Sequence, residues 1–366
     1  MNRDHDMSAK SKNNLNFLQV HSGRIFILGN ALASFGILLV TVGGSWDITN
    51  HLLSKPETFF SSPHALMYFG VLISLIGVAL SFTGWRNLRS FRESYQVSLK
   101  IGMVGIALLA GAGPFDFVWH SNFGLDGLLS PPHFMLITGM FLCSIGSMVG
   151  ISRYLKINSS GSVSAYMIIL AVVPVWLSGS GILSSLSLPF SSTDFFEFNP
   201  DPVLAFFVAS FGYPFLISIS MFFAFRLSDF KFGAMSILGS LFLLVYSSTA
   251  IMPNFALYDS IQFYLLNLIP FVMSDIILRY DRSKISCVFA GGLIGSTFYM
   301  VYYPYVMYTF NEVLLGKIVS PSLIYFVYFE LINKVFSLTV IPAIAMGIFA
   351  SLLSEKISKK IQMQRS

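Results

Sequence analysis

Residues 25–44 read IFILGNALASFGILLVTVGG, a run of twenty residues without one charged side chain. A helix rises 1.5 Å per residue, so this run can cross the hydrocarbon core of a bilayer, which is about 30 Å thick. The whole chain of 366 residues has the same character, with 55% hydrophobic residues, 11% charged residues and a mean hydropathy of +0.72. Soluble domains carry about 25% charged residues. The composition therefore excludes a soluble enzyme, a disordered chain and a coiled coil.

Further apolar runs of similar length follow along the chain. Because lipid offers the backbone no hydrogen bonds, we expect each run to form a helix. We predict an all-α fold, a polytopic integral membrane bundle of about ten transmembrane helices. The ten runs lie at residues 25–44, 64–84, 99–115, 133–151, 164–184, 203–225, 232–251, 259–278, 285–309 and 333–354. Residues 321–332 are also apolar, which leaves open whether the last helix begins earlier, kinks or follows a re-entrant segment.

The basic residues are distributed unevenly between the connections. If the N-terminus is cytoplasmic, all Lys and Arg residues except Lys55, Lys317 and Lys334, or 19 of 22, fall on the inner side. Cytoplasmic loops of membrane proteins carry such an excess. We therefore predict a multi-pass cell-membrane protein with both termini cytoplasmic and residues 1–24 as a polar cytoplasmic tail. The net charge of +5 then reflects topology, so we expect the lipid bilayer and no nucleic acid as partner.

Two of the predicted outer segments resemble each other. Residues 46–70 read WDITNHLLSKPETFFSSPHALMYFG, and residues 115–139 read FDFVWHSNFGLDGLLSPPHFMLITG. The two segments align without gaps at an offset of 69 residues, which indicates duplication of a unit of two helices joined by an outer loop. The matched pairs are Asp47 with Asp116, His51 with His120, Glu57 with Asp126, Pro63 with Pro132, His64 with His133, Gly70 with Gly139 and, further on, Gly77 with Gly146.

Four of the six histidines of the chain lie in these segments, at equivalent positions. In each segment an Asp and a His are four residues apart, which places them one turn apart on one helix face. A second His follows a proline at the start of the next helix, a position that favours proline. Two imidazoles and one carboxylate suit copper, zinc or non-haem iron and leave coordination positions open. The predicted metal ligands are Asp47, His51 and His64 at one site and Asp116, His120 and His133 at the other.

A second interpretation of the same residues stays open. Each Asp–His pair can instead be a hydrogen-bonded pair that caps or staples a helix end. Glu57 and Asp126 are candidates either for orienting an imidazole ligand or for solvating the loop. Ionisable groups at membrane depth are costly and usually functional, and the pattern occurs twice. Both arguments favour metal sites, which the predicted topology places near the outer membrane face.

The segment from Asp116 to His133 resembles the C-type membrane subunit of the copper membrane monooxygenases, the particulate methane and ammonia monooxygenases. It has Trp119 directly before His120, Asp126 in the middle and a proline shortly before the last His. The resemblance implies that the two ligand sets predicted above bind copper and that other membrane subunits of an oxygenase complex are partners. The likeness covers about residues 25–155, less than half of the chain.

The chain also departs from the pattern of that family. The second site of the family has an asparagine in place of the first carboxylate, whereas both copies here keep aspartate, Asp47 and Asp116. The chain is several helices longer, and it contains no soluble cupredoxin-like domain. We therefore expect a divergent, longer relative and not the oxygenase subunit itself.

The two motifs divide the chain into two membrane parts. We predict a half of four helices with the motifs at residues 25–155, and a second half of about six helices at residues 156–366. At the same offset, Ser185, Pro189 and Pro202 replace the ligands, so we interpret the second half as degenerate repeats, unless its Ser-Pro sequences are ordinary helix starts.

The functional hypothesis is a copper-binding membrane protein related to a copper-dependent monooxygenase, an oxidoreductase that activates dioxygen for a small apolar substrate. The alternative is a non-enzymatic metal-binding transporter, sensor or assembly factor. A zinc-dependent membrane hydrolase is a third hypothesis, which the identity of the metal would separate from the copper hypotheses.

Overall fold

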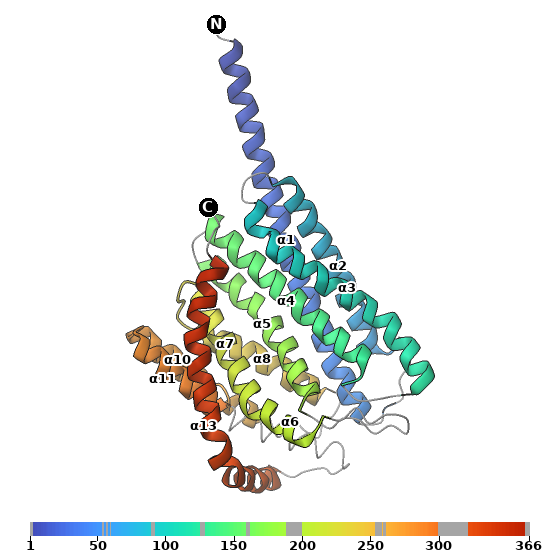
Figure 1. The fold of residues 1–366 in the computed structure, drawn as a ribbon, viewed down its shortest axis with the longest axis vertical. Coiled ribbons are helices and arrows are strands. Elements are labelled where there is room, and N and C mark those ends of the chain that lie inside the picture. Colours follow the sequence, from blue (N-terminus) through green and yellow to red (C-terminus); the bar gives the residue numbers. More distant parts are fainter. Residues whose placement is uncertain are drawn as a thin grey trace.

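All secondary structure described by the computed structural model is helical (Figure 1). The structure describes residues 3–52, 55, 58, 60–88, 92–124, 129–158, 162–187, 200–252, 258, 261–298 and 321–362. Within these ranges, side chains are described except at residues 3–19, 51–52, 162–163, 202, 250, 262–264 and 321–338.

The first four helices form two antiparallel pairs. They are α1 (Arg3–Leu52), α2 (Ser62–Asn87), α3 (Arg92–Phe123) and α4 (Pro131–Asn158). The helix α1 packs along α2, α3 packs along α4, and α4 also contacts α1. Because the chain reverses at each connection, the α1–α2 and α3–α4 connections lie at the same end of the bundle (Figure 1).

Except for the long last helix, the remaining helices are shorter and more often interrupted. They are α5 (Ser162–Ser185), α6 (Pro202–Phe207), the π-helical turn η1 (Val208–Gly212), α7 (Tyr213–Leu227), α8 (Ala234–Ile251), α9 (Ile261–Leu266), α10 (Ile269–Tyr280), α11 (Lys284–Leu293), the π-helical turn η3 (Ile294–Phe298) and α13 (Pro321–Gln362). The helix α6, the turn η1 and α7 follow one another directly and form one continuous helical segment.

Seven helical stretches in the described ranges are long and apolar enough to cross a membrane. They are Val20–Asn50, Ser62–Asn87, Arg92–Phe123, Pro131–Asn158, Ser164–Ser185, Val203–Leu227 and Thr339–Gln362. The predicted runs 232–251 and 285–309 fall on the shorter apolar helices Ala234–Thr249 and Lys284–Phe298. The predicted run 259–278 is divided between α9 and α10. The structure therefore supports a polytopic membrane bundle with seven long spans in its described part.

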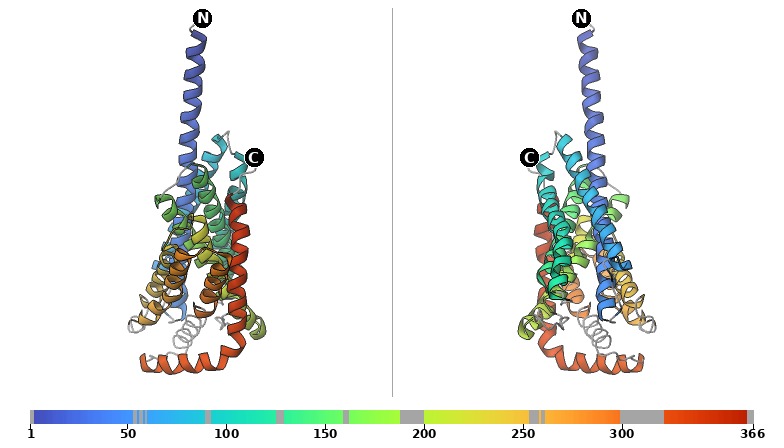
Figure 2. Two further views of the ribbon diagram at one scale, coloured as in Figure 1. Left: turned by 90° about the vertical axis from the view of Figure 1, so that its left-hand side faces the viewer. Right: turned by 90° about the vertical axis from the view of Figure 1, so that its right-hand side faces the viewer.

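The two terminal helices extend beyond their apolar runs. The helix α1 begins at Arg3, so the described part of the polar tail continues the first span as helix. The helix α13 begins at Pro321, so the apolar stretch 321–332 belongs to the last helix, and Figure 2 shows this part lying across the end of the bundle. Figure 1 shows α13 ending near the end of the bundle from which α1 protrudes.

Small residues bring the backbones of α1 and α2 close together. A Cβ atom added to Gly70 would lie 2.6 Å from the carbonyl oxygen of Gly36 and 2.8 Å from the nitrogen of Val40. A Cβ atom added to Gly77 would meet the backbone nitrogen of Ala33 in the same way. Real Cβ atoms do not approach backbone atoms this closely, so only glycine fits at these positions. Membrane helices use such small-residue seams because lipid gives no hydrophobic force between helices.

The pair α3–α4 repeats this packing. A Cβ atom added to Gly139 would lie 2.9 Å from the carbonyl oxygen of Gly105 and 2.7 Å from the nitrogen of Leu109. A Cβ atom added to Gly146 would lie 2.6 Å from the nitrogen of Gly102. Each of these contacts is the corresponding α1–α2 contact moved by 69 residues. The two helix pairs are thus packed at equivalent positions.

The later helices are held together by aromatic side chains. Trp176 on α5 is fully buried and stacks on Phe242 of α8, with ring centroids 3.7 Å apart. Phe271 of α10 and Phe298 of η3 contact the same indole edge to face. Buried residues of α4, including Met148 and Ile151, belong to the same cluster, so α4 joins the two helix pairs to this aromatic core.

We predict that Gly70→Ala destabilises the protein, because the new Cβ would collide with the backbone of α1. Overpacking of this kind costs roughly 1–3 kcal/mol. The matched control is Gly113→Ala on α3, where an added Cβ meets nothing within 4 Å. Thermal unfolding of the detergent-solubilised variants measures the difference. Equal melting of the two variants would contradict the close approach of α1 and α2.

Candidate metal centre

Asp116 and His120 lie near the C-terminal end of α3. The helix ends at Phe123, and Gly124 follows in the left-handed region with φ of 76°. Its N–H donates to the carbonyl oxygen of His120 at 3.0 Å. Glycine is the residue that most easily adopts this conformation after a helix. The stop at Gly124 therefore holds His120 in the last turn of α3, one turn beyond Asp116.

His133 comes from the opposite side of the connection. The helix α4 begins with Pro131 and Pro132, and the carbonyl oxygen of Ser130 accepts a hydrogen bond from the N–H of Phe134 at 2.9 Å. A proline at the first helical position lacks only an N–H that would have had no helical partner. The predicted helix start at this proline is therefore confirmed, and it places His133 in the first turn of α4.

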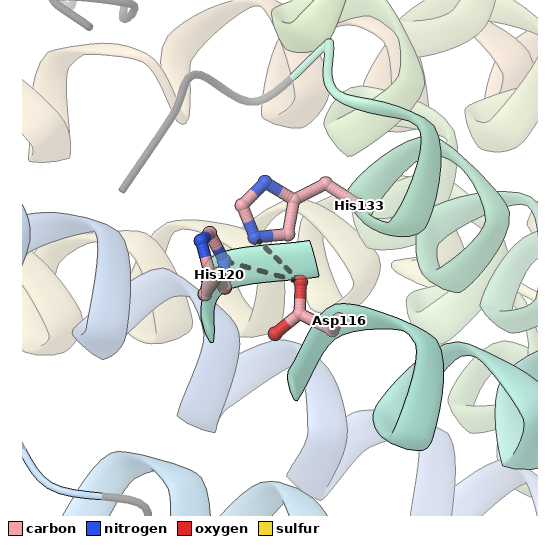
Figure 3. Close-up of side chains that lie close together, drawn as sticks. All are labelled: Asp116, His120 and His133. Atoms are coloured by element: carbon pink, nitrogen blue, oxygen red, sulfur yellow. Dashed lines mark ion pairs between the residues drawn. The ribbon is translucent and has the colours of Figure 1, made fainter. Parts of the chain in front are cut away.

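The three side chains converge, as Figure 3 shows. Nε2 of His120 lies 3.3 Å from Oδ1 of Asp116, and Nε2 of His133 lies 3.2 Å from the same oxygen. One potential ligand atom of each residue lies within 4.8 Å of the other two. The ligands of a tetrahedral ion, each bound at about 2.0–2.2 Å, lie roughly 3.3 Å apart. The three residues can therefore hold a metal ion with small side-chain adjustments.

Oδ1 of Asp116 is buried and accepts no hydrogen bond of regular geometry, although two imidazole nitrogens lie near it. A buried carboxylate oxygen without such a bond carries a free-energy cost. A cation between the oxygen and the two nitrogens would remove that cost. The side chains of Asp116, His120 and His133 are 31%, 21% and 25% exposed, so an ion can reach them from outside.

The ring of His120 is oriented by the backbone. Its Nδ1 lies 2.8 Å from the carbonyl oxygen of Gly124, which can only accept a hydrogen bond. Nδ1 therefore carries the proton, and Nε2 faces Asp116. Histidine ligands of metal ions usually make such a bond with the second ring nitrogen, which fixes the tautomer and the ring orientation. This contact could not be predicted from the sequence, because every residue has a backbone carbonyl group and the residue type does not show which one accepts the hydrogen bond.

The first motif has an equivalent arrangement in its described part. Nε2 of His64 on α2 lies 2.9 Å from Oδ1 of Asp47 on α1, matching the pair of His133 and Asp116 at the same offset. Nδ1 of His64 lies 3.0 Å from the carbonyl oxygen of Thr58. The helix α1 includes His51, but its side chain lies outside the described residues, so the third predicted ligand stays a prediction.

Two other predicted residues, Glu57 and Asp126, lie outside the described residues. Their proposed role in orienting an imidazole therefore stays a prediction.

Tyr68 links the two motifs electrostatically. It lies one helical turn after His64 on α2, with ring centroids 6.3 Å apart. Burial dominates the surroundings of its hydroxyl group, and the carboxylates of Asp116 and Asp47 lie within electrostatic range of it. No sequence signal singles out this residue, since Ile137 occupies the equivalent position of the second copy. Its position indicates that the two motifs face a common region of the bundle.

We predict that Nδ1 of His120 is protonated in the metal-free protein, because its neighbour is a carbonyl oxygen. Nitrogen-15 NMR of histidine-labelled protein in detergent measures this, with His120→Gln used to assign the resonance. The same is expected for His64. A neutral His120 with its proton on Nε2 would show that the ring is turned away from the position described here.

Comparisons of the chain with protein-family models, curated proteins and solved structures give no match. The functional interpretation therefore depends on the geometry of the three side chains and on the motif that contains them. Within the described part of the chain, the conclusion is a multi-span membrane protein with one Asp/His/His group able to bind a metal ion.

Proposed function

We propose that the chain is a copper-binding membrane protein, a divergent relative of the C-type membrane subunit of the copper membrane monooxygenases. The observation that carries the proposal is the convergence of Asp116, His120 and His133 on one point. These three residues, with Trp119 between the first two, form the motif that resembles that family. Copper is the metal that the resemblance implies.

The donor set agrees with a copper ion. Imidazole nitrogen is a good ligand for copper, and a single carboxylate balances part of the charge of the ion. Both histidines would bind a copper ion as neutral imidazoles, and the contact of Nδ1 with the carbonyl oxygen of Gly124 leaves Nε2 of His120 available for it. Zinc and iron accept the same ligands, so the metal has to be identified by measurement.

The proposal includes a second copper site at Asp47, His51 and His64. Two observations support it. The contact between Asp47 and His64 repeats that between Asp116 and His133. The glycine contacts between α1 and α2 repeat those between α3 and α4, which agrees with duplication of a helix pair. Tyr68 lies where the carboxylates of both motifs act on it, so the two sites would be neighbours.

We place the motifs at the outer membrane face and both termini in the cytoplasm, with ten crossings in all. The seven long spans, together with α8, α10 and α11, are consistent with ten crossings. An even number agrees with Figure 1, in which α13 ends near the end of the bundle from which α1 protrudes. The excess of Lys and Arg on the predicted inner side supports the direction.

In an oxygenase, copper with an open position supplies redox chemistry with dioxygen. The chain would contribute the parts of the site that do not react. Asp116 holds negative charge beside the two imidazoles, and the helix ends at Phe123 and Pro131 fix the spacing of the ligands. The partly exposed side chains leave one side of the group open to a substrate or a partner protein.

We predict that the purified protein retains copper and that His120→Ala removes about one copper ion per chain. The loss of one of three ligands weakens metal binding by at least the 10–100-fold seen when only an orienting partner is lost. Elemental analysis by mass spectrometry after dialysis gives the stoichiometry. His133→Ala is expected to behave in the same way.

The matched control is His21→Ala, the same change at an exposed position of α1 outside both motifs. It is expected to keep all of the copper. Full copper content in both His120→Ala and His133→Ala would refute the site. Zinc in place of copper would favour a hydrolytic or structural role.

A working oxygenase of this kind needs partner subunits, which separates it from a non-enzymatic copper protein. We predict that the chain co-purifies from its native membranes with further membrane subunits. The complex should also consume dioxygen in the presence of a reductant, and His133→Ala should lower this activity by about the 100-fold that weakened metal binding can cause. Quantitative proteomics and an oxygen electrode measure the two results. Copper binding without partners and without oxygen consumption would favour a transporter, sensor or assembly factor.

A further inference from the structure

The turn between α7 and α8 has a strained backbone. Asp229 and Phe230 have φ values of 55° and 61°, in the left-handed region that side chains other than glycine rarely adopt. Such strain persists only when the surroundings hold it, and it is often found at functional positions. The N–H of Phe230 donates to the carbonyl oxygen of Phe225 at 2.8 Å, and the two rings pack edge to face. The strained turn thus fixes the direction of Phe230.

Basic side chains cover the aromatic rings of this turn. The guanidinium group of Arg282 lies 5.6 Å from the ring centre of Phe230, and that of Arg279 lies 4.7 Å from the ring centre of Phe232. Both arginines are exposed and come from the end of α10 and the turn that follows it. A guanidinium group over a ring is attracted by the ring and keeps its N–H donors for other partners. Those donors fit a phosphate group in a bidentate way.

Further cations surround the two arginines, and this set of residues is called the basic turn cluster. It consists of Lys156, Lys231, Arg279, Arg282 and Lys284. The acids near them are Asp229, Asp281 and Glu355, which gives five positive and three negative charges. Glu355 is paired with Lys359, outside the cluster.

Asp229 forms an ion pair with Lys156 at 3.4 Å. Asp281 accepts hydrogen bonds from the hydroxyl group and the N–H of Ser283. Hydrogen bonds leave the Asp281 carboxylate charged, but neither Asp229 nor Asp281 forms an ion pair with Arg279 or Arg282 in the described part of the chain.

An apolar surface lies directly beside the cluster. Ile285 is 81% exposed and Tyr280 is 84% exposed, next to the arginines in the chain. The exposed apolar residues continue along both helices with Ile276 on α10 and Phe289 on α11. Figure 1 shows α10 and α11 at the edge of the bundle. In a membrane protein such a surface faces acyl chains, and tyrosine at its border lies at the level of the headgroups.

We propose that the basic turn cluster is a binding site for an anionic phospholipid, with the headgroup phosphate on Arg279 and Arg282 and the acyl chains along α10 and α11. Two separate features meet at this position, namely two exposed guanidinium groups and an exposed apolar surface. A soluble anion would use only the first feature, and a zwitterionic lipid would gain less from the surplus of positive charge. The site is independent of the metal motifs and takes a ligand of a different class.

The test is native mass spectrometry of the full chain in detergent, with dioleoylphosphatidylglycerol and dioleoylphosphatidylcholine as probes. We expect phosphatidylglycerol to bind on the order of 10–30-fold more tightly than phosphatidylcholine, since each of the two arginines favours an anionic lipid by roughly fivefold. The double variant Arg279→Gln, Arg282→Gln is expected to lose this preference. The variant Phe232→Leu removes only the ring below Arg279 and is expected to lower the affinity for phosphatidylglycerol by less than the double variant does. It provides a second test of the site if the double variant folds poorly.

The matched control is Arg86→Gln, Lys100→Gln, which removes two exposed cations from α2 and α3 and should bind phosphatidylglycerol like the unchanged protein. Inorganic phosphate at millimolar concentration should not displace the lipid. Equal binding of the two lipids would overturn the proposal. So would full retention of phosphatidylglycerol by the Arg279→Gln, Arg282→Gln variant, or its displacement by inorganic phosphate, which would indicate a site for a free anion.

Discussion

The close approach of helix backbones at glycine determines where the carboxylate of one helix meets the imidazole of the next. Gly70 against Gly36, and Gly139 against Gly105, leave no room for even a methyl group between the helices. With the backbones in contact, a short aspartate side chain reaches across to a histidine of the neighbouring helix. If the two helices were further apart, the aspartate and the histidine would both lie at the membrane boundary without contacting each other. The polar chemistry of the bundle therefore depends on residues that carry no polar side chain.

The same constraint explains which parts of the fold could be predicted from the sequence. The offset of 69 residues matched Gly70 with Gly139 and His64 with His133, and the structure places these residues in equivalent contacts. The spacing of Asp116 and His120 predicted one helix face, since the helical period is a local property. Proline before His133 predicted a helix start for the same reason. Local rules and repetition were sufficient for this much of the site.

Other features depend on tertiary contacts that residue types do not record. The carbonyl oxygen of Gly124 orients His120, but every residue has a carbonyl group. Tyr68 lies near both motifs only because α2 packs beside α3, and its counterpart in the repeat is not a tyrosine. The break between α9 and α10 at residues 267–268 lies inside an apolar run, so hydropathy alone predicted one helix there. Hydropathy left open whether the last helix begins before residue 333, and the structure shows that α13 begins at Pro321.

Ionisable side chains are stabilised in different ways at the two ends of the bundle. At the motif end, Asp116 is enclosed by two imidazoles, and its buried oxygen gains most from a cation that all three groups share. At the basic turn cluster, the two exposed arginines lie over aromatic rings and form no ion pair with Asp229 or Asp281. The first arrangement favours a small cation held inside the protein. The second favours an anion supplied by the surroundings. The metal and lipid ligands that we propose thus differ in charge because the two ends of the bundle present groups of opposite charge.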